Sequence, residues 1–152
     1  MPRIEQSVEI ECPLEIVYRI ARDVENFPDF MGDLQSLTLL EKSEDGLRTV
    51  TAWVGIVREF KITLKWTQVD QWDDVKFRDD FHQIKGDMDR MEGSWQFIPL
   101  DEKRTRFESV LDYDYNVPLI GPMVKNLIKK KLTDNLQATL NAIKQRAEES
   151  AA

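Results

Sequence analysis

Two side chains in the sequence could act as a general base or a nucleophile, those of His82 and Cys12. A serine or cysteine nucleophile needs an imidazole within hydrogen-bonding distance and a third group that orients the imidazole. His82 follows Asp79 and Asp80 near the end of a predicted strand, and we interpret it as an exposed structural residue rather than a catalytic base. Cys12 precedes Pro13 at a strand end and is interpreted as a small buried hydrophobic residue.

Paired carboxylates could carry out acid–base chemistry or hold a hard cation. Adjacent residues of a strand face opposite sides of a sheet, so two neighbouring aspartates cannot both enter one pocket. A solvated face is therefore the favoured interpretation of the three candidate pairs, Asp73 with Asp74, Asp79 with Asp80, and Asp112 with Asp114. The six glycines are scattered and form no phosphate-binding loop, so neither a nucleotide cofactor nor a metal is predicted.

The composition predicts one globular domain over residues 1–152, with a flexible polar tail at 147–152. A net charge of −7 argues against broad binding to nucleic acid. One cysteine and one histidine exclude an internal disulfide and the usual Cys and His zinc sets. The N-terminus lacks the apolar region of a signal peptide, and no apolar run approaches the ~20 residues that span a bilayer. A cytoplasmic location is expected.

The first part of the chain predicts a strand and two short helices. Apolar residues alternate over 4–10, which indicates a half-buried strand. Pro13 can begin a helix that reaches about Arg22. Pro28 disfavours helical geometry at the residue before it, so a separate helical turn is expected there, extending to about Leu34.

Residues 34–115 predict about six consecutive antiparallel strands. Asp45-Gly46 is typical of a hairpin turn between 37–44 and 47–57. Apolar residues alternate in five runs: Val50 to Ile56, Phe60 to Trp66, Val75 and Phe77, Met91 to Phe97, and Phe107 to Tyr115. Trp53 is out of phase with the first run and is expected to be exposed or at a partner interface.

The last segment predicts one long amphipathic helix. From Pro118 onward, apolar residues recur every three or four positions over about 28 residues. Lys125, Lys129, Lys130 and Lys131 form a basic cluster on this otherwise acidic chain. A solvated face is the ordinary interpretation, and a weak contact with anionic lipid headgroups, or with ribosomal RNA, is the functional one.

A strongly curved sheet that grips the long helix would bury both elements, and a cavity closed at one end by the two short helices could remain between them. Together with this order of elements, residues 10–18 (IECPLEIVY) and 23–30 (DVENFPDF) resemble the START-like helix-grip (SRPBCC) superfamily of polyketide cyclase/dehydrase and lipid-transport proteins over essentially the whole chain. Residues 24–30 are most similar to the branch with coenzyme Q-binding chaperones and ribosome-association toxin proteins. Cys12 departs from the alanine that is commoner in the superfamily.

The resemblance implies an α+β helix-grip fold, with a curved antiparallel sheet of about seven strands, and a hydrophobic ligand in an internal cavity. Arg58, Asp79, Ser109 and Tyr113 share the inward parity and could be polar anchors; for any single apolar position, a filled core is the alternative. The expected ligand-binding residues are Phe27, Phe30, Met31, Phe60, Trp66, Phe77, Met91, Trp95, Phe107, Ser109, Tyr113, Met123 and Leu127.

Three functions are consistent with these features. The first is binding or transport of a lipid, an isoprenoid quinone or a polyketide-like polycycle. The second is a cyclase/dehydrase, in which Arg58 and Tyr113 would promote aldol closure or loss of water. The third is a ribosome- or protein-interaction module that uses Trp53 or the lysine cluster.

Overall fold

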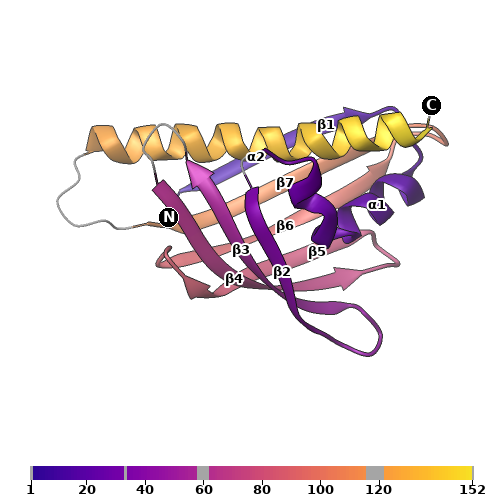
Figure 1. The fold of residues 1–152 in the computed structure, drawn as a ribbon. Helices are drawn as coiled ribbons and strands as arrows, with labels where there is room; N and C mark the ends of the chain where they lie inside the picture. The colour runs from indigo at the N-terminus through magenta and orange to yellow at the C-terminus, as the bar shows by residue number, and fades with distance from the viewer. Residues whose placement is uncertain (1, 33, 58–61, 116–121, 152) are drawn as a thin grey trace.

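The computed structural model describes residues 2–32, 34–57, 62–115 and 122–151. It contains a seven-stranded antiparallel sheet that curves around a long C-terminal helix, which confirms the predicted helix-grip fold (Figure 1). The elements in chain order are β1 (Arg3–Ile10), α1 (Leu14–Arg22), the 3₁₀ helix η1 (Val24–Asp29), β2 (Leu34–Lys42), β3 (Arg48–Val57), β4 (Ile62–Asp73), β5 (Arg78–Gly86), β6 (Arg90–Pro99), β7 (Thr105–Asp114) and α2 (Pro122–Ala151).

The strand order is β1-β7-β6-β5-β4-β3-β2. Strands β2 to β7 follow one another as hairpins, and β1 returns to pair with β7, with Ile4 opposite Leu111. The predicted turn between β2 and β3 is confirmed: Gly46 has φ 74°, and the Asp45 carboxylate accepts hydrogen bonds from the Leu47 amide at 2.9 Å and the Ser43 hydroxyl at 2.6 Å. Glycine reaches this left-handed conformation without the steric penalty of a side chain.

Helix α1 begins directly after Pro13, as predicted, and buries Leu14, Val17 and Tyr18. The Tyr18 hydroxyl donates a hydrogen bond to Asp74 Oδ1 at 2.6 Å, which ties α1 to the sheet. Pro28 lies inside η1, so the second helical turn is also confirmed. Leu34, however, is the first residue of β2 and not part of the turn.

The prediction of a strand at Val75 and Phe77 is wrong. Strand β4 continues to Asp73, whose carboxylate accepts hydrogen bonds from the amides of Val75 (3.0 Å) and Lys76 (2.9 Å) and so closes a tight turn. Val75 is 87% exposed in this turn, and Phe77 has φ 53°. An aspartate that bonds the backbone two residues ahead favours a turn over a strand, and this local signal outweighs the two apolar residues.

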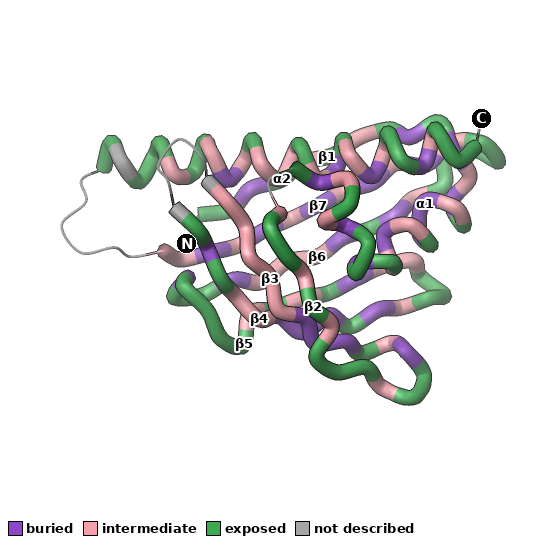
Figure 2. Tube along the Cα trace, in the orientation of Figure 1, coloured by how far each residue is buried: buried purple, intermediate pink, exposed green. Residues whose placement is uncertain are grey.

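Helix α2 buries one stripe of side chains along its second half, and Figure 2 shows its first turns exposed. Leu140, Ile143 and Ala147 have no exposed surface. The end that the sequence predicts to fray is helical through Ala151, and Glu148 accepts hydrogen bonds there from the Glu11 amide and Lys144. The predicted start at Pro118 lies outside the described residues.

Two clusters of buried side chains form the core. The larger joins α1, η1, the second half of α2 and strands β4, β6 and β7; the smaller surrounds Met91, Leu111 and Tyr113 and includes Leu132 of α2. Cys12 is fully buried, as predicted. No described helix is long and apolar enough to cross a membrane.

Candidate functional site

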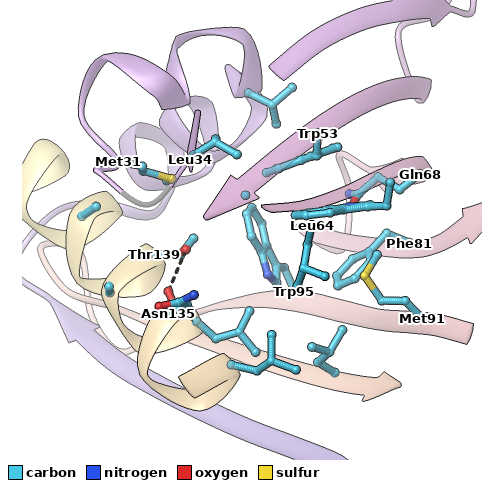
Figure 3. Close-up of a pocket in the computed structure, with 18 of the residues that line it drawn as sticks. Met31, Leu34, Trp53, Leu64, Gln68, Phe81, Met91, Trp95, Asn135 and Thr139 are labelled. Carbon is cyan, nitrogen blue, oxygen red and sulfur yellow. Dashed lines mark hydrogen bonds between the residues drawn. The ribbon is translucent and has the colours of Figure 1, made fainter. Parts of the chain in front are cut away.

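A cavity of about 280 Å³ lies between the inner face of the sheet and the second half of α2 (Figure 3). Its walls come from η1 and the residues after it, from strands β3 to β7, and from α2. Leu64, Phe81, Met91 and Leu111 supply aliphatic and aromatic surface on the sheet side. Apolar sites with few polar groups are how proteins hold hydrophobic small molecules.

Three of the lining residues are tryptophans, and two of them form a stack. The rings of Trp53 and Trp66, which face each other across β3 and β4, lie 5.6 Å apart with an interplanar angle of 14°. Trp53 Nε1 donates to the Thr51 hydroxyl at 2.7 Å, and Trp66 Nε1 donates to Gln68 Oε1 at 2.8 Å. Because both indole N–H groups are satisfied within the protein, their donors are not free to bind a ligand.

The prediction that Trp53 is exposed or at a partner interface is wrong, since this residue lines the cavity. The inner face of β3 carries Thr51, Trp53 and Gly55, opposite Gln68, Trp66 and Leu64 of β4. The alternating valines of β3 mark its other face. Valine favours strands through its branched side chain whichever face it occupies, so its alternation does not identify the inner face.

Residues of η1 and the turn after it bound the cavity next to α2. Phe30 and Met31 line the cavity, with Ala138 and Ala142 of α2 among the other lining residues. The guanidinium of Arg146 lies 5.6 Å from the centre of the Phe30 ring, in a cation–π contact between α2 and this segment.

The polar part of the sheet wall consists of Gln68, Asp70 and Asp79. Asp70 is 5% exposed and Asp79 is 1% exposed, so the expectation that Asp79 belongs to a solvated face is wrong. Burial raises the pKa of Asp79 well above its ordinary value, and the hydrogen bond to Asp70 and the charge of Asp70 raise it further. Burial also raises the pKa of Asp70, while hydrogen bonds from Asp79 and Gln68 oppose that rise.

The helix side of the cavity carries two further polar residues, Asn135 and Thr139. The Thr139 hydroxyl donates to the backbone oxygen of Asn135 at 3.1 Å (Figure 3). This bond within the helix occupies the hydroxyl proton of Thr139. The side-chain amide of Asn135 is the other polar group of α2 at the cavity wall.

The structure brings five of the expected ligand-binding residues together around the cavity: Phe30, Met31, Trp66, Met91 and Trp95. Five others lie in packed regions away from its lining: Phe27, Phe77, Phe107, Ser109 and Tyr113. Phe107 stacks on Phe97 at 4.5 Å, and Phe77 packs edge-on against Tyr18 at 5.1 Å. In these cases the filled-core alternative holds.

Met123 is 83% exposed and Leu127 is 40% exposed, which corrects the expectation that they reach the cavity. The first turns of α2 extend past the ends of the strands (Figure 1). Phe60 and Arg58 lie outside the described residues. Tyr113, the other candidate catalytic residue, is 3% exposed in the smaller core cluster, and burial raises the pKa of its phenol.

Sequence reasoning missed Trp53, Gln68 and Asp70 as cavity residues. A signal for the last two was present, because Leu64, Trp66, Gln68 and Asp70 alternate along β4 and so share one face. Among the described residues, no group of three His, Cys, Asp or Glu side chains could hold a metal ion. His82 is exposed on β5.

Comparison with known proteins agrees with this geometry. The sequence model of the family "Polyketide cyclase / dehydrase and lipid transport" matches residues 10–139. The ribosome association toxin RatA of Escherichia coli is 23% identical over 138 residues, which cover 91% of this chain and 84% of that protein. RatA of Pseudomonas aeruginosa is 24% identical over 147 residues, covering 96% of this chain and 95% of that protein.

Two solved structures share the fold over nearly the whole chain. TTHA0849 of Thermus thermophilus has a TM-score of 0.91 and 29% identity, covering 99% of this chain and 100% of that one. The Zhui aromatase/cyclase of a Streptomyces species has a TM-score of 0.90 and 19% identity, covering 99% and 96%. The family match spans most of the sequence, and the chain belongs to the polyketide cyclase/dehydrase and lipid-transport family.

Proposed function

We propose that this protein binds a hydrophobic small molecule in the cavity between the sheet and α2. The observation that carries the proposal is the mostly apolar wall of the cavity, which includes the rings of Trp53, Trp66 and Trp95. Ring faces pack best against other flat rings, through offset or edge-to-face contacts. A flat polycycle or a quinone ring therefore suits this wall better than a branched aliphatic chain.

The size of the cavity favours the same class of ligand. Its volume of about 280 Å³ is just below the usual range of ligand sites, which is roughly 300–1,000 Å³. One compact ring system fits this space, whereas a lipid with two acyl chains does not. An isoprenoid quinone would place its ring inside and its tail outside.

Native mass spectrometry of gently purified protein, followed by solvent extraction, tests the proposal. We expect a bound organic molecule in the wild type and none in Ala142→Phe, because Ala142 lines the cavity and a phenyl ring there occupies it. Asn141→Phe is the matched control, since Asn141 is exposed on the same helix. An added ring compound at about 100 times its Kd should stabilise the wild type by about 2.7 kcal/mol. A wild type that holds nothing, and that no ring compound stabilises, contradicts the proposal.

The buried acid Asp79 favours a second candidate, a dehydrase that uses the same cavity. A protonated Asp79 can donate its proton to a departing hydroxyl group, which leaves as water, while a carboxylate such as Asp70 takes the proton from the adjacent carbon as the double bond forms. The two candidates differ in what the protein releases. A carrier releases the molecule that it bound, and a dehydrase releases that molecule minus one water, which the same extraction and mass measurement distinguishes.

We further propose that the start of α2 makes a weak contact with anionic membrane surfaces. The buried stripe of α2, which includes Leu132, continues toward the start of the helix as Lys129 and Lys125, both exposed. Met123 and Leu127, which are also exposed, lie on the opposite side of these turns and share that side with exposed Lys130. Basic and apolar side chains together at a helix surface favour a lipid interface, where each lysine contributes about 1 kcal/mol.

Co-sedimentation with vesicles tests this contact. We expect binding to vesicles that contain phosphatidylserine, weakened by salt and by the triple change of Lys125, Lys129 and Lys130 to Gln. The same change at Lys42, Lys65 and Lys76, which are exposed on other elements, is the control and should leave binding intact. No sedimentation at low salt overturns the proposal, and so does pelleting with ribosomes alone, an outcome that the names of the RatA relatives make worth testing.

A further inference from the structure

The polar side chains on the sheet side of the cavity form one connected hydrogen-bond network. Trp66 Nε1 donates to Gln68 Oε1 at 2.8 Å, and Gln68 Nε2 donates to Asp70 Oδ1 at 2.7 Å. These two bonds fix which way the Gln68 amide faces, since its oxygen must accept and its nitrogen must donate. Asp70 is therefore the last acceptor of this hydrogen-bond network.

The side chain of Asp79 contacts Asp70 at the end of this hydrogen-bond network. In the register of β4 and β5, Asp70 is opposite Phe81 and Asp79 is opposite Trp72, so the two aspartates occupy diagonal positions on the same face. Two buried carboxyl groups in contact do not both ionise, and a hydrogen bond between them requires a proton. The hydrogen bond from Gln68 stabilises the charged form of Asp70, which favours Asp79 as the protonated member and as the donor to Asp70.

Asp79 is left with an acceptor that the described part of the chain does not satisfy. A single contact with Asp70 can serve only one of its two oxygens, and Oδ1 is buried with no N–H or O–H of a described residue donating to it. A desolvated acceptor without a donor is unfavourable, and a donor that reaches it recovers free energy. The indole N–H groups of Trp53, Trp66 and Trp72 donate to Thr51, Gln68 and Thr49, and no described residue donates to Oδ1. Asp79 itself lines the cavity.

We infer that Asp79, held by Asp70, is the polar anchor of the cavity and that it selects apolar ring compounds carrying a hydroxyl group. This inference rests on the proposed binding function and names the chemistry of the ligand. The hydroxyl donates to the free oxygen of Asp79 while the rings pack on the tryptophan wall. A carboxylate or phosphate does not fit, because no Lys or Arg is among the described lining residues and Asp70 repels an anion. An ammonium group would lose its hydration in this apolar space.

Isothermal titration calorimetry with four naphthalene probes tests the inference: 2-naphthol, 2-methoxynaphthalene, 2-naphthoate and 2-naphthylmethylamine. Naphthol and its methyl ether have the same rings, and only naphthol can donate through its oxygen. We expect the wild type to bind naphthol about tenfold more tightly than the ether, the gain of one hydrogen bond that would otherwise be missing. We expect naphthoate and the amine to bind more weakly than naphthol.

Two variants locate the preference at Asp79. Asp79→Leu keeps the branched shape of the side chain but removes the acceptor, so naphthol and its ether should bind equally. Asp79→Asn keeps an acceptor oxygen and an N–H that can face Asp70, so it should retain the preference and serves if the leucine variant does not fold. Asp80→Leu is the matched control, because the side chain of Asp80 is exposed and paired with Arg78. It should behave like the wild type.

The outcomes separate the anchor from the binding function. If naphthol and its ether bind the wild type equally well, the cavity binds rings but the anchor inference is wrong. If Asp79→Leu keeps the preference, another group provides it and the inference is also wrong. If the amine binds most tightly, the Asp70–Asp79 pair selects a cation instead of a hydroxyl group, and the inference is again wrong. If no probe binds, the proposed binding function itself fails.

Discussion

The carboxyl group of Asp79 would ionise in water, but in this fold it is surrounded by rings and faces a second carboxyl. Trp72 of β4 and Trp95 of β6 are its neighbours across the two adjacent strands. Among the charged groups near the pair, Asp80 raises the pKa of Asp79 and Arg22 lowers it. His82 lowers the pKa of Asp70. Burial is the largest cause for both aspartates, so their protonation responds mainly to how dry the cavity is.

This raised pKa makes stability depend on pH in a definite direction. Because the pKa of Asp79 is higher in the folded state than its ordinary value of 3.8, its protonation contributes stability that is complete below that value. The contribution is lost as the pH rises through the raised pKa. Asp79→Asn has no proton to lose there, so its free energy of unfolding relative to the wild type should increase as the pH rises. Urea unfolding of both proteins between about pH 4 and pH 9 measures this difference. Two parallel curves would show that Asp79 titrates normally.

At the scale of elements, the periodicity of the sequence predicted the helices and most strands. Strand β7 alternates without interruption between buried and half-buried residues, and α2 repeats its apolar residues every three or four positions. Such patterns are visible in the sequence because one whole face of each element packs against the core. The hairpin at Asp45-Gly46 was predictable for a different reason, since its turn chemistry is local.

The remaining errors come from features that a single segment does not contain. The inner face of β3 is set by its pairing with β4, which places Trp53 on Trp66, and Val50 and Val54 lie on the other face. Met123 follows the spacing of three or four residues locally, but over the length of α2 it lies on the side opposite the buried Leu132 and Ile143, and it is exposed. The same limit applies to the cavity residues. Phe107 and Trp95 both face inward, and three-dimensional packing alone decides that only Trp95 lines the cavity.

At the scale of the whole molecule, helix and sheet share their core, so we predict that they unfold together as one domain. Leu140 of α2 has no exposed surface and belongs to the cluster that also holds Ile10, Val17 and Phe107. Leu140→Ala should therefore lower the free energy of unfolding by about 2–5 kcal/mol. The unfolding midpoint measured by circular dichroism of the helix and the midpoint measured by near-ultraviolet signals of the sheet aromatics should both fall, to the same value. Separate midpoints for the two signals would contradict a single cooperative unit.

The tryptophans that line the cavity also allow intrinsic fluorescence to report whether the cavity is occupied. The chain has four tryptophans: Trp53, Trp66 and Trp95 line the cavity, and Trp72 is 2% exposed on β4, opposite Asp79. Most of the ultraviolet emission of the protein thus originates beside any occupant of the cavity. A ring compound that absorbs at the emission wavelength would accept excitation energy from three of the four emitters at once. Filling the cavity with such a compound would therefore quench most of the tryptophan emission.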